Sequence, residues 1–175
     1  MLGGAVALMP IFAKEILEMG PSGLGWLRAA PGIGAIAVVI WITKVPIKDH
    51  AGTILLSAVA LFGAATILFG VSTSIWLSLL ALFLVGAFDM VSVVIREVLL
   101  QLWTPDDVRG RVNAVNNIFL MASNELGEAR AGFIAAKWGA IITVIGGGVA
   151  AIGVTMMCGA LFPELRKVRQ LDKVE

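Results

Sequence analysis

Long apolar segments alternate with short polar connections along this chain of 175 residues. Residues 52–88 contain no acidic, basic or histidine side chain over 37 positions, and residues 138–163 form a second such run of 26. About 20 apolar residues cross a bilayer core of roughly 30 Å as a helix. The first run is therefore too long for one crossing. Gly70 and the Ser-Thr-Ser sequence at 72–74 predict a tight turn that divides it into two antiparallel helices.

This pattern predicts an all-α, polytopic membrane helix bundle over residues 1–163 and a cytoplasmic tail over 164–175. Complete spans are expected at about 23–43, 52–71, 75–96, 112–136 and 140–162. The apolar stretch 1–13 would rise only about 20 Å as a helix, which is shorter than the bilayer core. We therefore expect this stretch to be a partial span, the clipped end of a longer helix.

Composition and charge exclude several other classes of protein. Hydrophobic residues make up 59% of the chain and charged residues 14%, against roughly 45–50% and about 25% in soluble domains. A net charge of +1 leaves no basic surplus for nucleic acid. A single Cys and a single His cannot build a multi-cysteine metal site or a catalytic constellation. We expect a membrane protein that is not an enzyme and has no metal, no cofactor and no nucleic-acid partner.

The basic residues predict how the bundle is oriented. Eight Lys and Arg residues fall in connections and a tail on one side of the predicted bundle, against Lys14 and Lys137 on the other. Loops rich in Lys and Arg stay on the cytoplasmic side of a membrane. The sequence thus predicts a multi-pass protein of the cell (plasma) membrane with its C-terminus in the cytoplasm.

Four polar side chains inside the predicted span 112–136 are candidate pathway residues. Asn113, Asn117, Asn124 and Glu128 are spaced by 4, 7 and 4 positions, which keeps them on one face of a helix. Polar groups are costly within a bilayer and usually face a cavity or a partner. This face can line an aqueous path for a substrate. The same side chains can instead hydrogen-bond to neighbouring helices and hold the bundle together.

Two carboxylates lie near the expected mid-plane of the bilayer, Asp89 in the span 75–96 and Glu125 beside the polar face. Acidic residues at such depth relay protons in pumps and transporters, or are neutralised by a structural partner. Arg28, in the outer third of its span, is the expected counterion of Glu128 or of an anionic group on a substrate. Arg130 is expected to offset the same acidic cluster.

Three consecutive glycines at 146–148 lie in the middle of the last predicted span. The Lys-Ser/Thr pair that follows a phosphate-binding loop is missing after them. We interpret the run as a site of close helix packing or of local flexibility.

Two stretches of the sequence carry a resemblance to a known family. Residues 104–116 read TPDDVRGRVNAVN, and residues 122–128 read ASNELGE. Both resemble the C-terminal half of major facilitator superfamily transporters, in the enterobactin-exporter-like (transmembrane secretion effector) branch. Residues 23–32 and 89–96 are similar to that branch as well.

The resemblance implies helices seven to twelve of a twelve-helix transporter, the first of them clipped. It implies secondary active export of small molecules by alternating access. The partners it implies are the lipid bilayer, the substrate, protons and a missing N-terminal six-helix half. Arg109 and Arg111 would fix the cytoplasmic ends of helices by pairing with acids or helix C-termini. We expect the implied half not to be active alone. The alternative is a non-transporting membrane module, or a truncated remnant, that assembles with a partner half.

Overall fold

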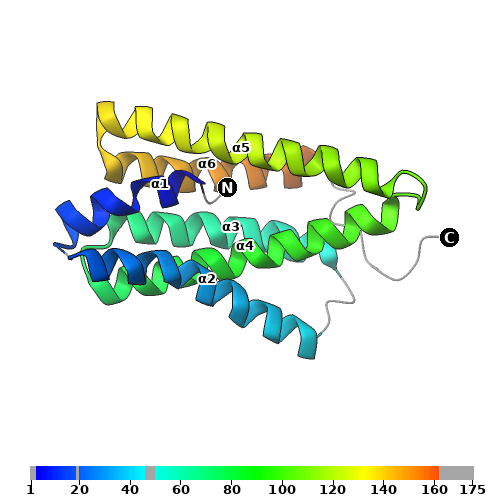
Figure 1. Ribbon diagram of the computed structural model, residues 1–175, viewed down its shortest axis with the longest axis horizontal. Helices are drawn as coiled ribbons and strands as arrows, with labels where there is room; N and C mark the ends of the chain where they lie inside the picture. Colours follow the sequence, from blue (N-terminus) through cyan, green and yellow to red (C-terminus); the bar gives the residue numbers. More distant parts are fainter. Residues whose placement is uncertain (1–2, 19, 46–49, 162–175) are drawn as a thin grey trace.

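The computed structural model describes residues 3–18, 20–45 and 50–161, and its regular elements in these ranges are all helices. They are α1 (Gly3–Ile11), the π-helical turn η1 (Phe12–Ile16), α2 (Pro21–Lys44), α3 (Ala51–Val71), α4 (Ile75–Trp103), α5 (Arg109–Trp138) and α6 (Ala140–Leu161). The long helices lie side by side along the bundle (Figure 1). The predicted all-α polytopic membrane bundle is confirmed.

Among the described residues, four helices are long and apolar enough to cross a membrane. They are α2 from Ser22 onward, α3, α4 and α6. The fifth predicted span, α5, has 30 residues and is therefore long enough, but its polar residues keep it out of this apolar group. Its place in the membrane stays a prediction. The predicted tail at 164–175 lies outside the described residues.

Two helices are longer than the sequence predicted. We expected α4 to end at residue 96, where charged residues interrupt the apolar run, but it continues to Trp103. Arg96 is exposed, and its Nε donates to the Ser92 carbonyl oxygen at 3.2 Å on the same helix. The charge therefore does not end the helix, because a long side chain can lie along it with its head group exposed. Likewise α5 begins at Arg109 rather than at residue 112.

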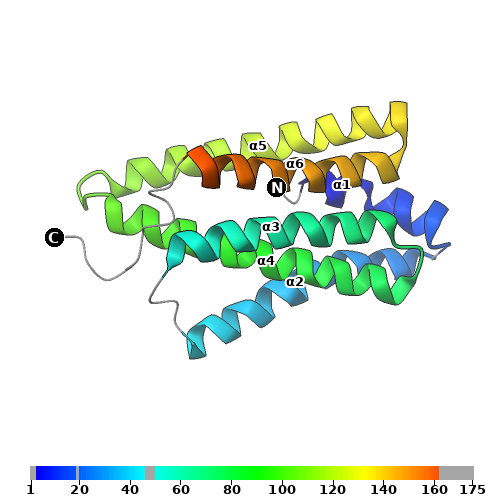
Figure 2. The same cartoon turned by 180° about the vertical axis from the view of Figure 1, so that it is seen from behind.

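The helices pack as two similar groups of three, one of α2, α3 and α4 and the other of α1, α5 and α6. In the first group α2 and α3 both pack against α4, and in the second α5 and α6 both pack against α1. The two groups meet where α3 packs against α6. Exchanging α1 with α4, α2 with α5 and α3 with α6 converts the contacts of α4 with α2 and α3 into those of α1 with α5 and α6, and leaves the α3–α6 contact as it is. The contact between α5 and α6 has no counterpart of similar extent between α2 and α3. In this arrangement, α2 and α5 occupy opposite edges of the bundle (Figures 1 and 2).

A buried core attaches α1 and η1 to the other helices. Phe12 of η1 and Phe69 of α3 are both fully buried, and their rings stack with the centroids 4.6 Å apart. The other buried residues of this core are Leu8, Met9, Ala13, Leu17, Leu27, Ala30, Ala81, Leu82 and Val144. This packing holds α1 near the end of the bundle at which α5 turns into α6 (Figure 1).

Glycines allow α3 and α6 to approach each other closely. A Cβ atom at Gly148 would lie 2.6 Å from the carbonyl oxygen of Gly63, and one at Gly63 would lie 2.8 Å from that of Gly148. Small residues commonly let membrane helices approach in this way. The close-packing interpretation of the glycine run is thus confirmed for Gly148. At Gly146 and Gly147 a Cβ atom would meet open space, so these two do not serve helix contact.

Candidate functional site

The polar helix α5 lies at the edge of the bundle and is covered little by its neighbours. Of its described residues, Ala131 is the one that is buried, whereas eight are buried in α4. Few residues of α5 are buried because this helix packs against α1 and α6 at one edge of the bundle, while α2 lies at the opposite edge. Its polar side chains therefore reach the surface of the bundle.

The structure keeps the four predicted pathway residues on one continuous helix. Asn113 is half-buried, while Asn117, Asn124 and Glu128 are exposed, and Glu125 is exposed beside them. Because α5 is regular from Arg109 to Trp138, their spacing places the four on one face. Of these side chains, Asn124 lines a cavity.

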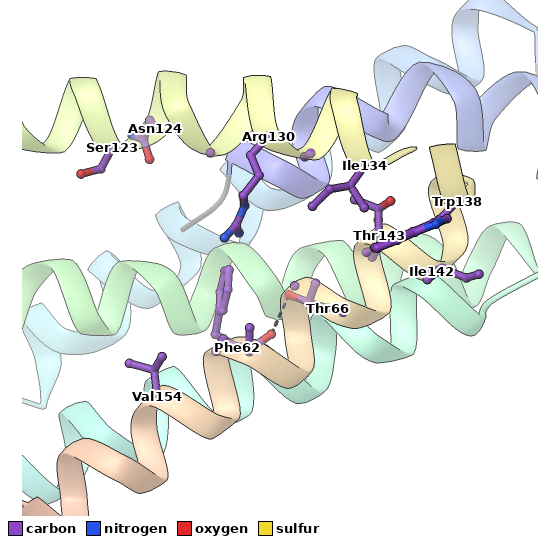
Figure 3. Close-up of a pocket in the computed structure, with 17 residues that line it drawn as sticks. Phe62, Thr66, Ser123, Asn124, Arg130, Ile134, Trp138, Ile142, Thr143 and Val154 are labelled. Atoms are coloured by element: carbon purple, nitrogen blue, oxygen red, sulfur yellow. Dashed lines mark hydrogen bonds between the residues drawn. The ribbon is translucent and has the colours of Figure 1, made fainter. Parts of the chain in front are cut away.

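That cavity has a volume of 620 Å³ and lies between α3, α5 and α6 (Figure 3). Small-molecule sites have volumes of about 300–1,000 Å³. The wall is largely apolar, and its one charged residue is Arg130. Its other polar side chains include Thr66, Ser123, Asn124 and Thr143. The arrangement can hold a molecule that is mostly apolar and carries a group able to accept hydrogen bonds.

Arg130 extends from α5 toward Phe62, which lies on α3 across the cavity (Figure 3). Within the described part of the chain, Arg130 forms no ion pair and no hydrogen bond. The expectation that it offsets the acidic cluster is therefore wrong for this structure. Gly127 lies three residues before Arg130 and Ile134 four residues after it, so a helix places the three on one face. This spacing is the signal in the sequence that could have placed Arg130 on a different face of α5 from Glu128.

The two threonine hydroxyl groups of the cavity each donate to a backbone carbonyl four residues earlier. Thr66 Oγ1 donates to the Phe62 carbonyl oxygen at 2.8 Å, and Thr143 Oγ1 donates to the Gly139 carbonyl oxygen at 2.8 Å. Both oxygens remain available as acceptors, but their protons are in use. The guanidinium of Arg130, with five N–H donors, is the strongest hydrogen-bond donor facing the cavity.

The predicted pairing of Arg28 with Glu128 is not formed. Across the described residues, the ion pair is Arg109 with Asp106. Arg28 is exposed on α2, and Glu128 is exposed on α5, at the opposite edge of the bundle (Figures 1 and 2). Similar depth in the membrane does not bring two residues together when α4 and α1 pack between their helices.

Asp89 is half-buried on α4, away from the surface residues of α5. The backbone of Asp89 accepts a hydrogen bond from Ser92, three residues further along the helix, whose Oγ donates to the Asp89 carbonyl oxygen at 2.8 Å. The suggested role of Asp89 in proton relay, like that of Glu125, stays a prediction.

Arg109 joins the end of α4 to the start of α5. Its Nη2 donates to the carbonyl oxygens of Gln101 and Thr104, each at 3.3 Å, and lies 2.6 Å from Asp106 Oδ1. These carbonyls stand at the negative end of the α4 dipole, where a cation is favourable. Arg111 is exposed on the first turn of α5. The contacts of Arg109 are of the kind that the family resemblance implied, whereas gating by either residue stays a prediction.

A family model described as transmembrane secretion effector matches residues 3–175. No curated protein and no solved structure gives a significant match to the chain. The family match includes the two stretches, 104–116 and 122–128, that carry the resemblance described above. Groups of three or more His, Cys, Asp or Glu residues that could hold a metal ion are absent from the described ranges.

Proposed function

Because the chain belongs to the transmembrane secretion effector family of the major facilitator superfamily, we propose that it forms one half of a secondary transporter that exports small molecules. The family is one of transmembrane transporters, and the four apolar helices fit a multi-pass membrane protein. The proposal adds the export direction, kinship with enterobactin exporters and proton coupling. It also adds a plasma-membrane location with a cytoplasmic C-terminus, and an N-terminal six-helix half as partner.

The observation that carries the proposal is the exposure of the polar face of α5. Asn117 and Glu128 are exposed on a helix that runs beside the apolar helix α6. Polar side chains at that depth are costly against lipid, so this face requires water or another polar protein surface. Transporters built from two repeats place their substrate path at the interface between the repeats. An aqueous path along α5 satisfies both requirements.

Two carboxylates supply the proposed proton coupling. Asp89 lies on α4 and Glu125 on α5, so the two belong to different three-helix groups of the bundle. A proton taken up by either carboxylate would change the charge of the path, which gives the exporter a means of coupling. This role rests on their depth and chemistry.

Cysteine accessibility tests the aqueous path. In a Cys158→Ser background, we expect single cysteines at 113, 117 and 124 to react with a small, water-soluble thiol reagent in native membranes. Reaction requires the thiolate, which forms in water and is suppressed in an apolar environment. The matched controls are cysteines at 156 and 157, where exposed methionines lie on the apolar helix α6. Equal reaction rates at the α5 and α6 positions would contradict an aqueous path along α5.

A further inference from the structure

The cavity between α3, α5 and α6 combines one unpaired cation with apolar walls. Arg130 is its charged residue, and no acidic side chain lines it. Ile134, Trp138 and Ile142 form the part of the wall nearest the turn between α5 and α6 (Figure 3). Polar side chains such as Ser123 and Asn124 lie on the opposite side of Arg130 along α5. Apolar side chains line the cavity on both sides of the guanidinium, Val154 toward Asn124 and Ile134 toward Trp138, with Thr143 beside Trp138 (Figure 3).

The position of Arg130 makes an anionic ligand favourable. It lies eight residues before the last residue of α5, which is about 12 Å along the helix at 1.5 Å per residue. α6 crosses the same depth as an apolar helix, so this depth is within the expected membrane. An arginine there is costly unless it is paired. Its side chain is exposed, and within the residues that the structure describes it forms no ion pair and no hydrogen bond.

The shape of the guanidinium and the volume of the cavity define the class of ligand. A guanidinium presents a planar fork that matches one carboxylate through two parallel hydrogen bonds. The volume of 620 Å³ lies within the range of small-molecule sites, about 300–1,000 Å³, and is enough for one acyl chain with its head group.

We propose that this cavity binds a single-chain amphiphilic carboxylate, of the fatty-acid type. Its carboxylate pairs with Arg130, and its hydrocarbon chain lies between α5 and α6 toward Trp138. Gly146 and Gly147 line the cavity and leave room for the hydrocarbon chain of the ligand, since a Cβ atom at either position would meet nothing within 4 Å. Binding does not depend on the proposed transport, because the contacts come from the cavity alone.

Quenching of Trp138 fluorescence tests the site in the full-length chain. Trp138 is made the single tryptophan by replacing the other four, which are Trp26, Trp41, Trp76 and Trp103, with Phe. The probe is 9,10-dibromostearate, whose bromine atoms quench a tryptophan that they contact, added to the protein in detergent. We expect saturable quenching that Arg130→Gln weakens by about tenfold or more in apparent affinity, and that Arg130→Lys weakens less, since Lys lacks the planar fork.

Three further arms make the outcome decisive. Arg96→Gln removes an exposed arginine on α4, away from this cavity's lining, and should leave quenching unchanged. Gly146→Leu fills the cavity without changing charge, and it should weaken binding in a protein that still elutes as a folded species. The methyl ester of the probe should quench without saturation, because its head group cannot form the ion pair.

Several results would overturn the proposal. Quenching by dibromostearate that is the same in Arg130→Gln would remove the role of the cation. Arg130-dependent quenching by brominated phosphatidylglycerol that equals that by dibromostearate would assign the site to a phospholipid. An absence of quenching with every probe would mean that a helix or a second copy of the chain covers the cavity.

Discussion

Replacing Gly86 with Ala is expected to destabilise the bundle severely. The new Cβ atom would lie against the carbonyl oxygen of Pro31 and 2.5 Å from both the carbonyl carbon and the Cα atom of that residue. All three are backbone atoms of α2, so no side-chain rotation can relieve the overlap and α2 must move away from α4. Overpacking within a core costs about 1–3 kcal/mol. Against a fixed backbone, we expect at least the upper end of that range in the free energy of unfolding.

The matched control is Gly32→Ala on α2. A Cβ atom at Gly32 meets nothing within 4 Å, so the new methyl group is free of overlap. Alanine is preferred over glycine in a helix interior by about 1 kcal/mol, and this variant should be as stable as the parent or more so. Thermal unfolding in detergent, followed by loss of the monodisperse species, measures both. Equal stability of the two variants would contradict the described contact between α2 and α4.

Replacing Phe69 with Ala is expected to have a comparably large effect. The side chain is fully buried and stacks on Phe12, so its removal leaves a cavity between α3 and η1. Truncation of a buried phenylalanine costs about 3–5 kcal/mol. Because this core also holds α1 in place, the packing of α1 against α5 should loosen along with it.

Phe133→Ala provides the comparison for that change. Phe133 lies on α5 and is 73% exposed, so its truncation should change the unfolding free energy by only about 0.5 kcal/mol. Unfolding of the two variants under the same detergent conditions gives the difference directly. If Phe69→Ala were as stable as Phe133→Ala, the core that joins η1 to α3 would be described wrongly.

The helices could be predicted from the sequence because the bilayer fixes their length and polarity. The run 52–88 contains two crossings and one short turn, and the structure divides it into α3 and α4 at Ser72–Ser74. The ends of α4 and α5 could not be placed in the same way. Near the membrane surface, charged residues such as Arg96 and Arg109 are compatible with a continuing helix, so hydropathy underestimates its extent.

The candidate site depended on which faces of the helices meet, and the sequence carries less information about this. Depth along a helix follows from residue number, so Arg28 and Glu128 were predicted to pair. The pairing fails because their helices lie at opposite edges of the bundle. Arg130 lies on the same helix as Glu128 but faces the cavity, because the packing of α5 beside α6 decides which side is enclosed.

Gradient-driven flux through the purified chain tests the central claim, that this bundle is one half of a transporter. The chain is reconstituted in proteoliposomes, a proton gradient is imposed, and movement of lipophilic dyes and siderophore-like compounds is followed against protein-free vesicles. With the polar face of α5 uncovered by a second half, we predict no flux above that of the protein-free vesicles. Gradient-dependent flux that disappears in Asp89→Asn or Glu125→Gln would contradict the claim and identify the chain as a complete transporter.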